Sequence, residues 1–245
     1  YDGSLKASVI LKDLAPFVPA LSRFEEPLDL NLVFSGHGKH LDCPTLRLTN
    51  HHGLMIAGEA ALSNWDAGMD MYIYGKLGNL TMTKEGINVL MTNLTGKVPP
   101  ILQRLDYIRF NGEAAGYLHD LTLTGLFHTG AGMGKTDVMM SIDEQSMSRT
   151  YSGSVASADL DLGKLLNQEK KFGKVDFNVE LKGFNYKNRY PESYIKGIIS
   201  SFEYSQYQYE NIMLDGVYKD GGFNGRLSMD DANGSVQIDG NFNVA

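Results

Sequence analysis

Alternation of apolar and polar residues with a period of two is the feature that most constrains this chain. It is clearest at residues 28–35, where Leu28, Leu30, Leu32 and Phe34 alternate with Asp29, Asn31, Val33 and Ser35. The pattern recurs at Leu46 and Leu48 and over 69–73, 175–181 and 236–244. Successive residues of a strand point to opposite faces of a sheet, so these runs predict half-buried β-strands.

Turn residues separate the strand patterns at short and fairly even intervals. Examples are Ser35-Gly36, Asn111-Gly112, Asp220-Gly221-Gly222 and Asn233-Gly234. Such punctuation indicates strands joined by short connections, which predicts an all-β, mainly antiparallel fold. The runs suggest roughly 15–18 strands, and open sheets of that width usually curl or split. We therefore expect an elongated, curled sheet.

Helical patterns are sparse and short. Apolar residues take helix-like spacing beside a proline or a capping aspartate at 12–21, 98–105 and 160–167. Each is soon followed by a new strand pattern, so we expect short helices at the edge or mouth of the sheet. We predict one continuous elongated β domain over 1–245, built of loose repeats at about 1–97, 98–159 and 160–245. Because strand patterns begin and end the chain, we expect a segment of a longer protein.

Composition and charge exclude several classes of partner. The chain has 22 Lys and Arg against 29 Asp and Glu, a net charge of −7, and it has no basic cluster interleaved with aromatic residues. A nucleic-acid partner is therefore disfavoured. A single cysteine, Cys43, excludes an internal disulfide framework. No apolar run approaches the ~20 residues that a membrane-spanning helix needs.

The sequence HTGAGMGKT at 128–136 imitates a phosphate-binding loop. Gly134-Lys135-Thr136 fits that motif, but Thr129 stands where the first glycine is required. The mechanism also needs a helix directly after the loop, whose N-terminal N–H groups hold the phosphate. The residues after Thr136 instead show largely strand spacing, so we predict a glycine-rich hairpin and no nucleotide.

Other reactive side chains have structural explanations that we prefer. His37, His40, His51 and His52 are close in sequence, but they flank glycine turns without the spacing typical of a zinc site. Cys43 with a histidine would need a geometry that sequence does not show. The carboxylates Asp159, Asp161, Asp230 and Asp231 are expected at turns and helix caps. We therefore predict no enzyme, no catalytic residue, no metal and no cofactor.

The C-terminal part of the chain carries a set of three short motifs within 204–243: Asn211-Ile212-Met213-Leu214-Asp215-Gly216, Phe223-Asn224-Gly225-Arg226-Leu227 and Asp231-Ala232-Asn233-Gly234. With these motifs, this part of the chain resembles TamB-type translocation and assembly proteins of the AsmA-like superfamily. Residues 158–186 are similar to a helix-then-strand unit of the Bacteroidetes members. Before residue 158 only the general pattern of the sequence is similar, and no specific motif matches.

This resemblance implies a β-taco, a long sheet bent into a U with an apolar inner face. Such proteins are periplasmic, anchored in the inner membrane, and bind or conduct phospholipid towards the outer membrane or support outer-membrane protein assembly. The implied partners are phospholipid or another acyl ligand, a BamA-like outer-membrane barrel protein, and the inner membrane through an anchor outside this segment. Candidate lipid-groove residues from the alternating runs are Leu28, Leu30, Leu32, Phe34, Leu46, Leu48, Met69, Met71 and Ile73.

The residues themselves leave an alternative open. The same alternation would build a closed sandwich, and a β-rich binding or adhesin-type module for carbohydrate is the second hypothesis. Aromatic residues that would stack on sugars are Phe202, Tyr204, Tyr207, Tyr209 and Tyr218. Alternation places Phe202 and Tyr204 on a different face from Tyr207 and Tyr209 unless a bulge intervenes.

The first testable prediction concerns the loop at 128–136. Because this stretch lacks the first loop glycine and a following helix, we expect no binding of ATP or GTP. Lys135→Ala should leave stability and activity unchanged. Titration calorimetry checks this, and micromolar nucleotide affinity that disappears in Lys135→Ala would contradict it.

Overall fold

The computed structural model describes residues 1–14, 22–143, 145–146, 148–185 and 192–243. The chain divides into two compact units. Unit 1 comprises Tyr1–Leu118 and Phe127–Gly130, and unit 2 comprises His119–Leu126 and Ala131–Ala245. Strands account for 69% and helices for 12% of the structure, which is mostly antiparallel. The predicted fold class, all-β with a few short helices, is confirmed.

Unit 1 is a run of antiparallel hairpins followed by two helices. Its elements are β1 (Asp2–Ile10), η1 (Leu11–Leu14), β2 (Pro27–His37), β3 (His40–Thr49), β4 (Leu54–Ser63), η3 (Gly68–Asp70), β5 (Tyr72–Thr83), α1 (Lys84–Thr95), α2 (Pro100–Gln103) and β6 (Tyr107–Tyr117). From β1 to β6 each strand pairs with the next in antiparallel register. Strand β7 (Asp120–Thr129) contains residues of both units.

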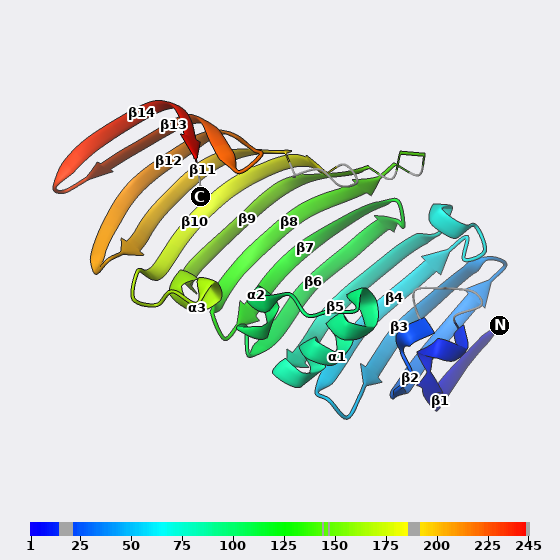
Figure 1. Cartoon of the computed structure of the whole chain (residues 1–245). Helices are drawn as coiled ribbons and strands as arrows, with labels where there is room; N and C mark the ends of the chain where they lie inside the picture. The colour runs from blue at the N-terminus through cyan, green and yellow to red at the C-terminus, as the bar shows by residue number, and fades with distance from the viewer. Residues whose placement is uncertain (15–21, 144, 147, 186–191, 244–245) are drawn as a thin grey trace. The chain divides into compact units, whose positions relative to one another are not determined.

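Unit 2 continues the same order of strands. Its elements are β8 (Gly132–Ile142), β9 (Arg149–Asp161), α3 (Leu162–Leu166), β10 (Phe172–Asn185), β11 (Glu192–Tyr204), β12 (Tyr207–Lys219), β13 (Gly222–Asp231) and β14 (Gly234–Asn243). Strand order in the described sheet is sequence order from β1 to β14, without a crossover (Figure 1). The repeat boundaries predicted near 97 and 159 are not boundaries of the two units.

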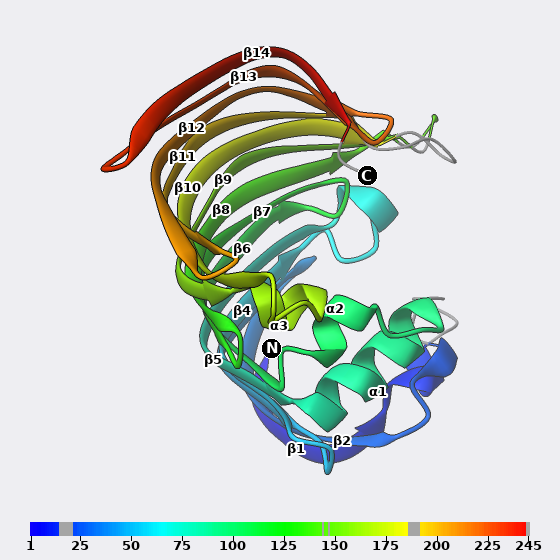
Figure 2. The ribbon, with the colours of Figure 1, turned by 60° about the vertical axis from the view of Figure 1, so that its left-hand side comes forward.

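In each unit the strands are bent along their length, so that each unit has a concave and a convex face (Figure 2). The helices α1 and α2 lie on the concave side of unit 1 (Figure 2). Among the described residues no second sheet packs on either unit, because every strand belongs to one unclosed, curled sheet. A closed sandwich, the alternative that alternation left open, is therefore not the fold.

Two of the three predicted helices are found and are shorter than expected. Residues 98–105 contain α2, which has a proline at its first position, and 160–167 contain α3. The Asp161 side chain caps α3 by accepting a hydrogen bond from the Lys164 backbone N–H at 2.8 Å. At 12–21 the structure shows η1 up to Leu14, and residues 15–21 lie outside the described residues.

The longest helix, α1, was not predicted. Thr83 caps its N-terminus by accepting a hydrogen bond from the Gly86 N–H, and Gly96 ends it in the left-handed conformation with φ 77°. These are ordinary start and stop signals, with apolar Ile87, Leu90 and Met91 at helical spacing between them. The helix was missed because strand patterns flank it on both sides.

Glycine 153 allows β9 to lie close to β8 in unit 2. Its φ of 140° is rare for residues that have a side chain. A Cβ atom added there would lie 2.1 Å from the backbone oxygen of Asp137 on the neighbouring strand. Both facts require a residue without a side chain at this position.

We predict that Gly153→Ala lowers the free energy of unfolding by roughly 2–3 kcal/mol, because it combines a strained φ with a steric clash. Gly234→Ala in the same unit is the matched control. It has open space around the added Cβ, so we expect a change within about 0.5 kcal/mol. Urea denaturation measures both, and equal effects of the two substitutions would refute the steric argument for Gly153.

Candidate functional site

The apolar face of unit 1 is a set of apolar rows that cross the strands. Directly paired residues share a face, so the register places them side by side. One row consists of Leu5, Leu32, Leu46, Gly58, Leu77 and Gly112, and the next of Ala7, Leu30, Leu48, Ile56, Leu80 and Phe110. An end row contains Val9 and Leu28 on β1 and β2, and Leu54, Met82 and Ile108 on β4 to β6. Together these three rows are the apolar face of unit 1.

Bulges keep this face apolar where strict alternation would fail. Leu77 and Leu80 are three residues apart in β5, and the register with β6 shifts between them. The inserted residue returns Leu80 to the face that carries Leu77. A shift between Cys43 and Leu46 has the same effect in β3. The Asn111 side chain donates to the Gly78 carbonyl at 2.9 Å and so holds the bulge of β5.

Most of the apolar face of unit 1 is half exposed, and its end row is the better covered part. Leu5 is 42% exposed, whereas Leu28 and Leu54 in the end row are 5% and 8% exposed. Helix α1 begins directly after β5 and contacts β5, β6 and α2. Its Ile87 is only 1% exposed. The helix therefore packs against the end of the apolar face and leaves the middle rows open.

Most of the predicted groove residues share this face. Leu28, Leu30, Leu32, Leu46 and Leu48 lie in its rows. Phe34 follows on β2 with its ring against Gly3 of β1. Ile73 pairs with Leu62 of β4, which pairs with Leu41 of β3. Whether these residues bind lipid stays a prediction.

Met69 and Met71 do not lie in a strand, contrary to the strand predicted over 69–73. Met69 is in η3, Met71 is its C-terminal cap, and β5 begins at Tyr72. Gly68 has φ 60°, and the Met71 N–H donates to the Gly68 carbonyl. Residues 68–70 form a turn of 3-10 helix, and the Met71 carbonyl accepts the Leu118 N–H at 3.2 Å just beyond β6, so the alternation of these letters does not extend β5.

Unit 2 has an apolar face built in the same way. The sequence predicted some of its strands, but none of its residues was proposed as part of a site. One row consists of Val138, Gly153, Leu181, Ile195, Gly216, Gly225 and Gly240. The next consists of Thr136, Val155, Val179, Gly197, Leu214, Leu227 and Ile238. These two rows are the apolar face of unit 2. Only Met69 to Ile73 and the first strands were considered as groove residues, although 175–181 alternate equally well.

An aromatic ladder occupies one end of β10 to β12. It consists of Phe172, Phe202, Tyr204, Tyr207 and Tyr209, whose neighbouring ring centroids lie 4.6–6.4 Å apart. The prediction that Phe202 and Tyr204 face away from Tyr207 and Tyr209 is wrong. A two-residue turn with positive φ at Ser205 and Gln206 pairs Tyr204 directly with Tyr207, and paired residues share a face.

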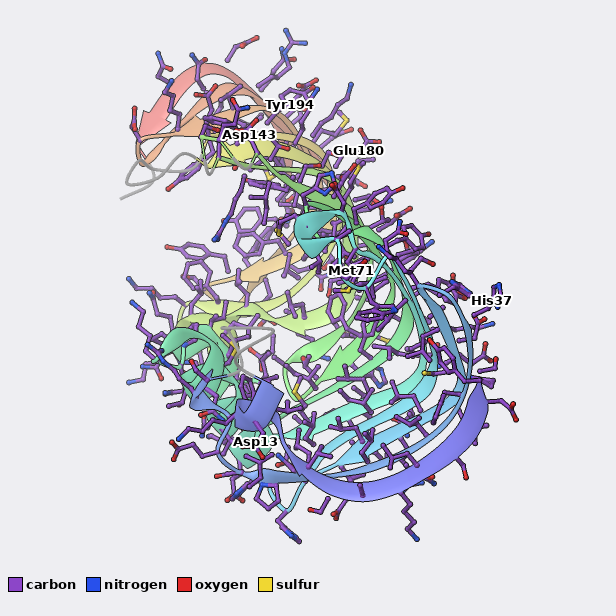
Figure 3. All side chains as sticks on the ribbon, turned by 90° about the vertical axis from the view of Figure 1, so that its right-hand side faces the viewer. Asp13, His37, Met71, Asp143, Glu180 and Tyr194 are labelled. Carbon is purple, nitrogen blue, oxygen red and sulfur yellow. The ribbon has the colours of Figure 1, made fainter. Side chains whose placement is uncertain are left out.

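The opposite, convex face of unit 2 carries alternating charges. Asp239, Arg226, Asp215, Lys196 and Glu180 stand opposite one another on successive strands from β14 to β10. Arg226 bonds Asp239 through Nε and Nη2 at 3.1 and 3.0 Å. Tyr194 donates to Asp215 at 2.8 Å, and this hydrogen bond, with burial, raises the pKa of Tyr194. Figure 3 shows Glu180 and Tyr194 on the side away from the concavity.

The side chains considered for catalysis or metal binding have local roles. Lys135 and Thr136 lie within β8, and a strand follows the false phosphate loop, as predicted. Burial raises the pKa of Cys43, with a further contribution from Asp42. Asp231 accepts the Asn233 N–H in a turn, and Asp159 pairs with Lys174 at 2.9 Å. Across the described ranges no three His, Cys, Asp or Glu side chains are grouped as a metal site would require.

The four histidines do not come together as a set. His37 and His40 lie at the β2–β3 hairpin, with His37 at the outer margin of unit 1 in Figure 3. His40 contacts the Asp42 carboxylate at 2.9 Å and Ser63 at 2.7 Å. His52 lies in the turn between β3 and β4, where its ring contacts Glu26 and Glu85.

No helix in the described part of the chain is long and apolar enough to cross a bilayer.

Comparison with known proteins adds no relative to this description. No protein-family model, no curated protein and no solved structure matches the chain.

Proposed function

We propose that this chain is a non-enzymatic, lipid-handling segment that holds acyl chains against the apolar faces of its two units. The observation that carries the proposal is a continuous apolar surface that the fold leaves half exposed. In the described residues, eight apolar side chains are buried: Leu28, Cys43, Leu54, Ile87, Ala131, Leu165, Val175 and Ile212. A sheet that buries so little of its apolar face exposes surface that a hydrophobic ligand would remove from water.

The rows have the dimensions of an acyl chain. The two middle rows of unit 1 cross six strands, from β1 to β6. At ~4.8 Å between strands, such a row is about 24 Å long. One leaflet of a bilayer contributes about 15 Å of hydrocarbon, half of the ~30 Å core. A row is thus long enough for one acyl chain, and its aliphatic side chains place no directional demand on the ligand.

The resemblance to TamB-type proteins supports a cell-envelope context for the proposed activity. On this proposal the segment is periplasmic and belongs to a protein that an anchor outside the segment fixes to the inner membrane. It binds or conducts phospholipid between the inner and outer membranes, or supports outer-membrane protein assembly with a BamA-like barrel protein. The residue pattern at 204–243 and the curled, single-layered sheet support this reading.

The aromatic ladder supports a second candidate, a carbohydrate-binding module. Five rings gather on one face, and the Tyr207 hydroxyl also donates to Asp231 at 2.9 Å. Aromatic faces flanked by polar groups are suited to stacking on sugar rings. The rings also pack on one another, as in the edge-to-face pair Tyr207 and Tyr209, which ordinary sheet packing would produce as well.

The acyl-chain proposal is tested by replacing one apolar side chain of the apolar face with a charged one. Leu30 pairs with Ala7 and Leu48 in a middle row. Leu30→Asp places a carboxylate where an acyl chain would lie, without a partner, and desolvating it is costly. We expect at least a tenfold loss of affinity for a fluorescent fatty acid with a cooperative melt retained. Native mass spectrometry should find co-purifying phospholipid on the wild type and none on Leu30→Asp.

Asn31→Asp is the matched control, because it adds the same charge one residue away on the opposite, exposed face. It should bind like the wild type. Absence of lipid from the wild type, together with global unfolding of Leu30→Asp, would contradict the proposal.

The second candidate predicts a different result. Soluble oligosaccharides should release no heat with the wild type if the chain handles lipid. Saturable heat that is lost in Tyr209→Leu, while fatty-acid binding is absent, would favour the carbohydrate module. Titration calorimetry on the same preparation decides between the two.

A further inference from the structure

The start of α1 is attached to the turn between β3 and β4. Thr83 donates its hydroxyl proton to the His52 carbonyl at 2.7 Å, and its N–H donates to the Gly53 carbonyl at 3.1 Å. Gly86 lies so close that a Cβ atom there would be 3.0 Å from the His52 carbonyl oxygen. The helix that packs on the end row is therefore held where its first turn meets His52.

The His52 ring adds two charged contacts to this attachment. Its Nδ1 is 2.7 Å from Oε1 of Glu85, in the first turn of α1. Its Nε2 is 2.8 Å from Oε2 of Glu26, one residue before β2. Both ring nitrogens thus face carboxylate oxygens. The contact with Glu85 is a hydrogen bond, whereas the contact with Glu26 has the distance of an ion pair without hydrogen-bond geometry. The imidazolium attracts both carboxylates, and a neutral ring keeps only a hydrogen bond.

Two neighbouring cations in the described part of the chain, Lys12 and Lys84, lie near other carboxylates. Glu25 pairs with Lys12, and Lys84 of α1 lies 3.9 Å from Asp106. Asn50 accepts the backbone N–H groups of His52 and Leu54, and His51 is the exposed neighbour in the same turn. Oε2 of Glu26 is buried and accepts no hydrogen bond, so the charge of the imidazolium at 2.8 Å is what compensates it. Loss of the proton leaves two carboxylates without their shared counter-charge.

We propose that His52 is a proton-operated latch that holds α1 on the end row of the apolar face of unit 1 and releases it when the ring is neutral. Release uncovers the ends of β5 and β6 that α1 contacts, where Met82 and Ile108 lie, and so opens the end of the face to an acyl ligand. This role in ligand access rests on the proposed function. The latch itself rests only on the contacts of His52.

The direction of the pH dependence follows from the two carboxylates. The hydrogen bond to Glu85 and the charges of Glu26 and Glu85 raise the pKa of His52, against a smaller opposing effect of burial. A group with a raised pKa in the folded state contributes its full stabilisation below its unfolded value of about 6.5. That contribution is lost as pH rises through the higher folded value. The latch is closed in mild acid and open in mild alkali.

Hydrogen exchange of the whole chain, followed by mass spectrometry between about pH 5.5 and 8.5, tests the latch. After correction for intrinsic rates, we expect the amides of α1 to lose protection several-fold as pH rises. His52→Gln should show low protection at every pH. His40→Gln is the matched control, because His40 also contacts a carboxylate and lies away from α1, and it should retain the wild-type pH profile.

Glu85→Gln keeps the test valid if His52→Gln does not fold. It removes one carboxylate, so the loss of protection should occur at lower pH than in the wild type. A pH profile that is the same in wild type, His52→Gln and Glu85→Gln would overturn the latch.

A fluorescent fatty acid, added at both ends of the pH range, separates the latch from the proposed function. Tighter binding at pH 8.5 in the wild type, and equal binding at both pH values in His52→Gln, supports both. A pH-dependent α1 with no fatty-acid binding at any pH supports the latch and contradicts the function. Fatty-acid binding together with a pH-independent α1 supports the function and contradicts the latch.

Discussion

Hydrogen bonding between strands that are consecutive in the chain is the constraint on which the rest of this structure depends. Because each strand pairs with the next in antiparallel register, residues that alternate along the chain become continuous rows across it. A second layer usually covers the apolar side of a sheet. Here short helices cover an end row in unit 1, and the remaining rows stay half exposed. These partly exposed apolar rows are the observation on which the acyl-chain proposal rests.

Bulges and glycines adapt that constraint to a bent sheet. A bulge adds one residue, which restores an apolar side chain to its face after a break such as the one between Leu77 and Leu80. Glycines allow close approach where the strands bend, as Gly153 does against Asp137. Both devices have been used to introduce curvature into sheets by design. Bulges and glycines thus adjust register and strand spacing at particular positions of the sheet.

Local patterns were predicted from the sequence, and contacts between distant segments were not. The strands around 28–35 and 175–181 are found because their alternation is set by the pleat alone. Whether the apolar side faces a second sheet depends on the order in which the strands pair. Alternation along one strand gives no information about that order. The shared face of Tyr204 and Tyr207 depends on a two-residue turn that resets the alternation. The contacts of His52 with Glu26 and Glu85 join residues 26 and 33 positions apart in sequence, and no motif announces them.

The identity of strand order and sequence order has a consequence for how such a molecule is made and how it changes. Each new strand pairs with one that has already been synthesised, so the sheet can grow hairpin by hairpin as the chain emerges. Duplication or loss of a hairpin would lengthen or shorten the sheet without rethreading it. The number of strands in such a sheet can therefore change one hairpin at a time while the pairing order of the others is kept.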